Sequence, residues 1–200
     1  MNFFLNKVFL VGFLIVLNGC SPFGSGSLKN FVSIQKNQRL INVELPNGYC
    51  IDDNMGVSTD YLDTKFITNC VSIKRDSGKI FGRRPVDSII SLTVTDMKLP
   101  ASLSEKDFFN TIMIDEKLEN LLTNSNSIRM KVRKKTLRDE LVILDLQQTS
   151  VISSVRKVRK YIFLVGQRIT IMTITNFDEN LKPEYKKFES LIKSLKNASS

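Results

Sequence analysis

The sequence predicts an α+β domain, in which an antiparallel sheet carries one central helical region at about residues 104–123 and a C-terminal helix packed on it. The strands are predicted from short β-branched runs, four of which follow one another with very short connectors. Short connectors favour antiparallel neighbours. The helices are predicted from apolar residues at helical spacing. A chain of 200 residues with 42% hydrophobic residues suits one such domain, over residues 31–198.

The first strands are predicted before the central helix. "VSIQ" (32–35) and "RLINVEL" (39–45) are short β-type runs. "KFITNCVSI" (65–73) is another, and it would bring Cys70 onto a strand. "SIISLTVTDM" (88–97) is strongly β-branched and indicates a strand directly before the central helical region.

The central helix is predicted to begin at Ser104 with a pattern like a capping box. Its apolar spacing slips near Asp115, so either one kinked helix or two short helices are expected. The closing helix is predicted after Pro183, with Phe188 and Leu191 on its apolar face. Between the helices, the four predicted strands are Ile128–Lys135, Leu141–Ser150, Val155–Val165 and Gln167–Thr175.

This order of elements resembles the PsbP/Mog1-like fold, with its early strands, helix, long antiparallel meander and closing helix. Separately, "ELPNGYCIDD", "TKFITNC" and "GQRITIMTITNF" resemble an uncharacterised group of alphaproteobacterial envelope lipoproteins. The residues that carry this second resemblance are structural rather than catalytic, so it implies a fold and a compartment but no activity. They are Pro46, Gly48, Tyr49, Cys50, Asp52, Phe66 and Cys70.

The N-terminal segment predicts a lipoprotein signal peptide at residues 1–19. Lys7 precedes ten residues without a polar side chain, Val8–Leu17, which is too short for a spanning helix but suits the core of a signal peptide. The run ends in "LNGC", which resembles a bacterial lipobox and makes Cys20 the lipidated first residue of the mature chain. A plain secretion signal with Cys20 as a structural thiol is the alternative, but no A-x-A cleavage site stands at the right place.

Lipidation of Cys20 also predicts where the protein is found. Acyl chains, palmitate among them, would anchor it to the cell envelope. Ser21, rather than Asp, follows the cysteine, and this resembles the sorting pattern for the periplasmic face of the outer membrane. Residues 20–30 would then form the lipidated N-terminus and a flexible tether.

Assigning Cys20 to lipid leaves Cys50 and Cys70 as an even pair. An oxidising periplasm favours a disulfide between them, which would close a loop of about 21 residues and stabilise the fold by on the order of 3 kcal/mol. Two free thiols or half of a metal site are the alternatives. The chain has no His and no CxxC motif, which argues against a metal.

The composition argues against an enzyme, and no cofactor is expected. Without His there is no His-dependent triad, and no GxSxG motif or Gly-rich phosphate loop appears. Asp139-Glu140 is the most visible carboxylate pair, but it is predicted to be a turn between two strands. A Ser–Lys dyad remains open. The acids between the two paired cysteines, such as Asp60 and Asp63, do not have EF-hand spacing and are interpreted as turn residues rather than a calcium site.

The clearest chemical pattern is basic, in a chain of net charge +9. In "SIRMKVRKK" cations alternate with Met130 and Val132, so a period of two places them on one face of a strand. A second basic run would share the same sheet region if the meander folds back. A half-solvated sheet face explains these runs without any function. The predicted anion-binding residues are Arg129, Lys131, Arg133, Lys134, Lys135, Arg156, Lys157, Arg159 and Lys160.

Taken together, these features favour a membrane-anchored, non-catalytic binding or assembly module. Its expected partners are the membrane, through the N-terminal lipid, and an anionic lipid, lipopolysaccharide or an acidic envelope protein at the basic surface. A carrier that holds an apolar small molecule or lipid between sheet and helices is the alternative. A hydrolase comes third. Nucleic acid is not expected, because an exported lipoprotein rarely meets it and Tyr161 is the only aromatic residue among the cations.

Overall fold

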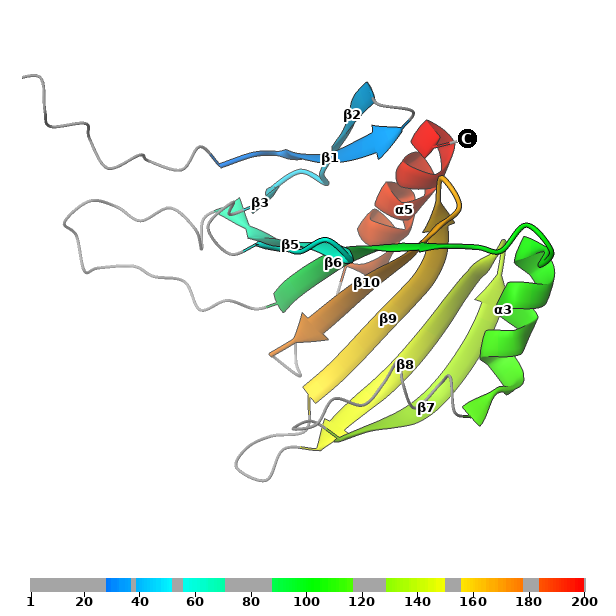
Figure 1. Ribbon diagram of the computed structural model, residues 1–200. Coiled ribbons are helices and arrows are strands. Elements are labelled where there is room, and N and C mark those ends of the chain that lie inside the picture. The colour runs from blue at the N-terminus through cyan, green and yellow to red at the C-terminus, as the bar shows by residue number, and fades with distance from the viewer. Residues whose placement is uncertain are drawn as a thin grey trace, which may run out of the picture.

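Eight strands form the main sheet of the computed structural model (Figure 1). The structure describes residues 28–36, 39–51, 56–70, 88–116, 129–149, 156–177 and 184–199. The strands of the main sheet run in the order β3-β5-β6-β10-β9-β8-β7, and β4 pairs with β5. Their bounds are β3 Tyr49–Ile51, β4 Val57–Ser58, β5 Leu62–Asn69, β6 Ser88–Lys98, β7 Arg129–Arg138, β8 Leu141–Thr149, β9 Arg156–Val165 and β10 Arg168–Asn176.

The predicted antiparallel meander is confirmed. β7, β8, β9 and β10 pair in sequence order, and β10 then pairs antiparallel with β6. Two of the hairpins in this meander close with two-residue turns. These are Asp139-Glu140 between β7 and β8 and Gly166-Gln167 between β9 and β10. All four turn residues have positive φ, as type I′ turns require.

Two helices and a second, smaller sheet complete the described fold. The helices are α3 (Glu105–Ile114) and α5 (Tyr185–Ser199). β1 (Phe31–Lys36) and β2 (Arg39–Glu44) pair only with each other as strands, and a single bridge from Lys29 to Ile51 joins this hairpin to the main sheet. The mixed composition of a large antiparallel sheet and two helices agrees with the predicted α+β class.

The main sheet buries a different apolar cluster on each face. On the face that we call the α5 face, Ile143, Tyr161 and Met172 stand side by side across three strands and pack with Phe188 of α5. The β1–β2 hairpin adds Val32 and its partner Val43 to the same cluster, and α5 contacts both β2 and β9.

On the opposite face, the α3 face, a second cluster forms. Leu146 of β8 and Val158 of β9 are register partners and pack with Phe109 and Ile112 of α3. α3 contacts β7 and β8, which lie at one edge of the sheet (Figure 1). Because the side chains of a strand alternate between faces, each central strand contributes to both clusters.

Several predicted boundaries were wrong. Cys70 follows β5 rather than lying on a strand, since β5 ends at Asn69. The three-residue β3 and two-residue β4 are too short to give a recognisable alternation, and β1 and β2 leave the main sheet. The central helix ends at Ile114, where the apolar spacing slips, and Asp115 is extended. Residues 117–123 and Pro183 lie outside the described part of the chain.

Ser104 caps the first turn of α3, as the sequence predicts. Its hydroxyl accepts a hydrogen bond from the backbone N–H of Asp107 at 3.1 Å. Neither helix in the described ranges is long and apolar enough to cross a bilayer.

Candidate anion-binding surface

The structure divides the predicted basic residues between the two faces of the sheet. Lys131 of β7 and Lys157 of β9 are both register partners of Gln147, which lies between them on β8, so all three share the α5 face. Lys135 and Lys160 are both partners of Leu144 and therefore lie on the α3 face. The two basic runs do lie in one region of the sheet, on either side of β8, as expected if the meander folds back. The prediction did not foresee that their cations are divided between the two faces.

A bulge in β7 causes the division. The register shifts between Val132 and Lys134, so Arg133 is an extra residue without a partner in the ladder. Without the bulge, Lys134 would face away from Lys131. With it, Lys134 pairs with Asp145 on the α5 face, and Lys135 turns to the α3 face. The guanidinium group of Arg133 donates to Oε1 of Gln147, which brings Arg133 to the α5 face as well.

The two cations on the α3 face belong to the packing of the domain. Nζ of Lys135 donates to the backbone carbonyl of Met113 at 3.3 Å, so it satisfies an acceptor in the last turn of α3. Burial lowers the pKa of the half-buried Lys160 below its ordinary value. Neither residue belongs to the exposed basic surface.

Arg159 lies on the α5 face but is held by neighbours. Its Nε and Nη2 donate to the two carboxylate oxygens of Asp145 at 2.5 and 3.0 Å, and its guanidinium carbon lies 3.8 Å from the ring centre of Tyr185. Burial opposes the charge of Arg159, but hydrogen bonds with Asp145 and Tyr161 outweigh it and raise its pKa above the ordinary value. Arg159 therefore joins β8, β9 and the start of α5.

The remaining cations form the exposed surface that we call the basic corner, which comprises Lys131, Arg133, Lys134 and Lys157. All four side chains are exposed. None of the ion pairs found within the described ranges includes any of them. Asp145, the nearest acid in the register, is bound in two places by Arg159. The basic corner is thus a group of like charges that an anion would stabilise.

Two predicted residues cannot be assigned to this corner. Arg129 pairs with Thr149 and Arg156 with Gln148, which lie two residues and one residue beyond Gln147 toward the end of the sheet. The side chains of Arg129 and Arg156 lie outside the described residues.

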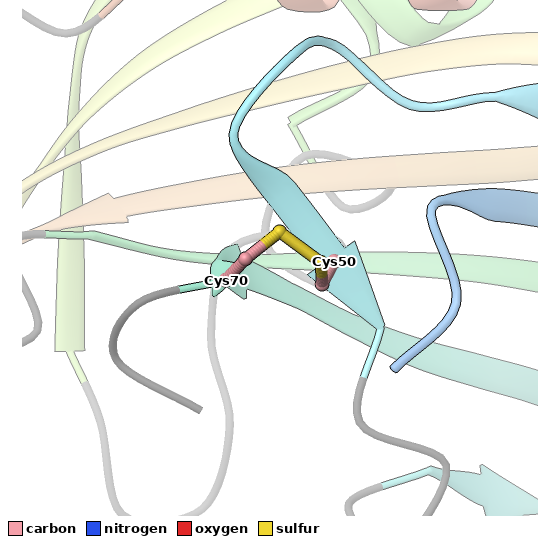
Figure 2. Close-up of a disulfide and its surroundings, with 2 residues drawn as sticks. All are labelled: Cys50 and Cys70. Carbon is pink, nitrogen blue, oxygen red and sulfur yellow. A yellow bond between two sulfur atoms is a disulfide. The ribbon is translucent and has the colours of Figure 1, made fainter. Parts of the chain in front are cut away.

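Cys50 and Cys70 form a disulfide with an S–S distance of 1.99 Å and a Cα–Cα distance of 4.9 Å. The bond ties the short strand β3 to the residue that follows β5 (Figure 2). Beside it, the ring of Tyr49 packs edge-on against Phe188 of α5, with the ring centres 4.9 Å apart. The two cysteines that the sequence pairs therefore stand near the contact between the sheet edge and α5. Cys20 lies outside the described residues.

The described residues can also be compared with the alternatives of a carrier and an enzyme. Tyr161, Phe163 and Phe188 are each at most 2% exposed and fill the space between the sheet and α5. Asp139 and Glu140 lie at an exposed turn, as predicted. Within the described ranges, no group of three or more Cys, Asp or Glu side chains lies close enough together to hold a metal ion.

No model of a known protein family matches this chain, and no curated protein matches it. Several solved structures are similar in shape. One is the Ran-binding protein Mog1p of Saccharomyces cerevisiae, with 9% identity, a TM-score of 0.45, and coverage of 83% of this chain and 92% of that chain. A mutant of Mog1 gives 8% identity and a TM-score of 0.44, and covers 84% of this chain and 93% of its own.

Cyanobacterial PsbP from Synechocystis is another similar structure, with 16% identity, a TM-score of 0.41, and coverage of 92% of this chain and 97% of that chain. Both names in the predicted fold resemblance, PsbP and Mog1, thus occur among the structures to which this chain is similar. At TM-scores below 0.5, these likenesses carry no argument about function.

Proposed function

We propose that this protein is a lipid-anchored, non-catalytic binding or assembly module of the cell envelope, which holds an anionic partner at the basic corner. One contrast carries the proposal. Nearby cations of the same region are paired, Arg159 with Asp145 and Arg138 with Glu189 at 2.7 Å, whereas the four residues of the basic corner have no ion pair within the described ranges. An anionic partner would supply the missing charge.

The overall charge supports the same conclusion. Loss of Lys7 with the signal peptide leaves a net charge of +9 − 1 = +8, which attracts anions over a distance of about one Debye length, roughly 10 Å at 0.1 M salt. Close to an anionic membrane, each Lys or Arg contributes about 1 kcal/mol. Four exposed cations are therefore sufficient for a reversible interaction that salt weakens.

A binding role also suits the chemistry of the surface. The basic corner consists of Lys and Arg side chains around Gln147, and the chain contains no His, the most frequent general base. Lysine and arginine side chains on a sheet face attract and orient anions without transforming them. The proposal therefore includes no catalytic step.

Anchoring through Cys20 is tested by membrane fractionation. After a wash in about 1 M salt, which screens the charges of the basic corner, the wild-type protein should sediment with membranes. The Cys20→Ala variant, exported with a signal peptide that is cleaved without lipidation, should be released into the soluble fraction, because the anchor requires acyl chains on that residue. A soluble wild-type protein would contradict the anchor. So would a Cys20→Ala variant that stays on the salt-washed membrane after its signal peptide is cleaved.

The basic corner is tested on the Cys20→Ala protein with a panel of anionic surfaces, namely anionic vesicles, polyglutamate and dextran sulfate. Lys131→Glu/Lys157→Glu should weaken binding to the preferred surface by roughly 30-fold or more, at about 1 kcal/mol per cation. The matched control is Lys98→Glu/Lys193→Glu, which changes the net charge equally on exposed lysines of β6 and α5 that lie away from the corner. Equal losses in both variants would show that net charge alone drives binding and would overturn the role of the corner.

A further inference from the structure

We infer that the anionic partner of the basic corner is the phosphate surface of a phospholipid bilayer, and that the domain rests on it with the end of the sheet where β8 ends and β9 begins. The inference rests on the proposed function and names its partner. Three features of the described residues support it: the breadth of the basic corner, the position at which the chain enters the sheet, and the composition of the opposite end.

The basic corner is broad rather than convergent. Lys131 and Lys157 flank Gln147 in one row across three strands, so their backbones are about 10 Å apart. Lys134 stands in the next row on the same face. Arg133 is fixed beside Gln147 by its hydrogen bonds. Cations spread over two rows fit several phosphate groups on a surface better than one small anion in a pocket.

The chain enters the main sheet at the same level as these cations. Lys29 bridges to Ile51, and the register continues from Ile51 through β5, β6 and β10 to Arg159. These register partners form one row across the sheet. Arg159 pairs with Asp145, and Asp145 pairs with Lys134, which ends the row at the β7 edge. The entry point and the basic corner therefore lie toward the same end of the sheet, at opposite edges.

The tether is long enough for this arrangement. Six strand spacings separate β3 from β7, or about 29 Å. The eight residue steps from Cys20 to Leu28 span at most about 29 Å. A lipid on Cys20 can therefore sit in the bilayer that the basic corner touches. Tethering raises the effective concentration of lipid phosphates at the corner, and this favours the membrane over a separate acidic protein.

The opposite end of the sheet has a different composition. Tyr61 and Met97 are 78% and 64% exposed, and they flank the position where β5 begins and β6 ends. Asn176 pairs with both Ser88, at the start of β6, and Lys157, so Ser88 and Lys157 lie in the same row of the sheet. Met97 is nine residues further along β6, or about 30 Å from this row. Tyr61 and Met97 thus lie far from the bilayer, whereas Phe177, which is 37% exposed, directly follows the row of Lys157. The contact is therefore mainly electrostatic.

Fluorescence quenching tests this orientation, because the chain contains no Trp and one introduced Trp is a clean reporter. Lys186→Trp places it in the first turn of α5, next to Tyr185 and hence near Arg159, whereas Tyr61→Trp places it at the far end. Each substitution is made in the Cys20→Ala protein, so that no acyl chain holds it on the vesicles. The vesicles contain phosphatidylglycerol and a lipid with a quencher on its head group.

Lys186→Trp should be quenched and Tyr61→Trp should not. Quenching should disappear at about 1 M salt, where the screening length falls to about 3 Å. It should also disappear in Lys131→Glu/Lys157→Glu, whose vesicle affinity is expected to fall by roughly 30-fold. Equal quenching of both reporters, or quenching of Tyr61→Trp alone, would overturn the orientation.

Three further outcomes test this inference against the proposed function. Tighter binding to polyglutamate than to phosphatidylglycerol vesicles would identify an acidic protein as the partner and overturn the inference, while the proposed function would stand. Equal binding to phosphatidylglycerol and neutral phosphatidylcholine vesicles would also overturn it. If the protein bound none of the anionic surfaces, both this inference and the proposed function would be overturned.

Discussion

At the scale of single residues, Tyr161 shows how burial and charge act together on the α5 face. Its side chain is completely buried, and its hydroxyl donates to Oε1 of Glu189 at 3.5 Å. Arg159 also forms a hydrogen bond with this hydroxyl. Burial raises the pKa of Tyr161 to about 12, although the bond from Arg159 acts in the opposite direction. The folded state therefore favours the neutral phenol.

This shift predicts that the protein loses stability at alkaline pH. An unfolded tyrosine has a pKa of about 10, so the contribution of Tyr161 is fully present below pH 10 and is lost as the pH rises through about 12. The loss amounts to about 2–3 kcal/mol. Tyr161→Phe removes the titrating group, so the free energy of unfolding in urea should fall less steeply between about pH 10 and pH 12 than in the wild type.

The exposed Tyr61 provides the matched control for this experiment. Tyr61→Phe removes a hydroxyl at the far end of the sheet and should keep the wild-type slope. A Tyr161→Phe variant with the same alkaline slope as the wild type would show that other groups cause the loss.

At the scale of secondary-structure elements, the turn between β7 and β8 has an unusual sequence for its backbone. Asp139 and Glu140 have φ values of 51° and 55°, in the left-handed region. Asn-Gly is the preferred pair in such type I′ turns, because other side chains clash with the backbone there. Nζ of Lys196 donates to the carbonyl of Asp139 at 3.1 Å and lies 3.3 Å from Oε2 of Glu140, so the end of α5 supports the turn.

Replacing the turn by Asp139→Asn/Glu140→Gly should stabilise the protein by about 0.5–1 kcal/mol. Glycine removes a left-handed penalty of roughly 1–2 kcal/mol at residue 140, and the loss of the exposed ion pair with Lys196 offsets a small part of this gain. Thermal unfolding should show a melting temperature about 1–4 °C higher. Glu140→Gln, which loses only the charge, should give no increase. A melting temperature in the double variant at or below that of Glu140→Gln would contradict the explanation by strain.

The elements also show which features of the fold the sequence predicts. The four strands of the meander are predictable because their turns are two-residue or short connections and their side chains alternate. The faces are harder to predict, because one inserted residue exchanges them. A signal for the bulge is nevertheless present: the apolar residues of β7 are at even positions, Met130 and Val132, and then at an odd one, Leu137. This change of phase marks the bulge at Arg133.

The basic surface is less predictable than the strands, for a tertiary reason. A pattern of charges in one strand does not reveal which cations a distant segment will pair. Arg159 is bound by Asp145 and covered by Tyr185 of α5, and Lys135 donates to α3. Both contacts depend on how the helices dock on the sheet. The sequence therefore predicted the basic region, and among the predicted cations whose side chains the structure describes, four are exposed and have no ion pair.

At the scale of the whole molecule, the edge of the sheet near β3 joins three parts of the fold. The disulfide ties β3 to the end of β5, and the bridge from Lys29 to Ile51 leads to the β1–β2 hairpin. Tyr49 packs on Phe188, and its hydroxyl donates to Glu184, just before α5, at 3.5 Å. Strand β3 has only three residues, so its position depends strongly on these contacts.

Removing the disulfide should therefore destabilise the fold and loosen this edge first. For a loop of about 21 residues, Cys50→Ala/Cys70→Ala should lower the free energy of unfolding by on the order of 3 kcal/mol and the melting temperature by roughly 6–12 °C. A reductant should shift the wild type to the value of the variant and leave the variant unchanged. Hydrogen exchange should rise most in β3 and the first turn of α5, because Tyr49 links them. Cys20→Ala provides the control for loss of a cysteine outside the loop, and a wild type unaffected by reductant under unfolding conditions would contradict the stabilising role.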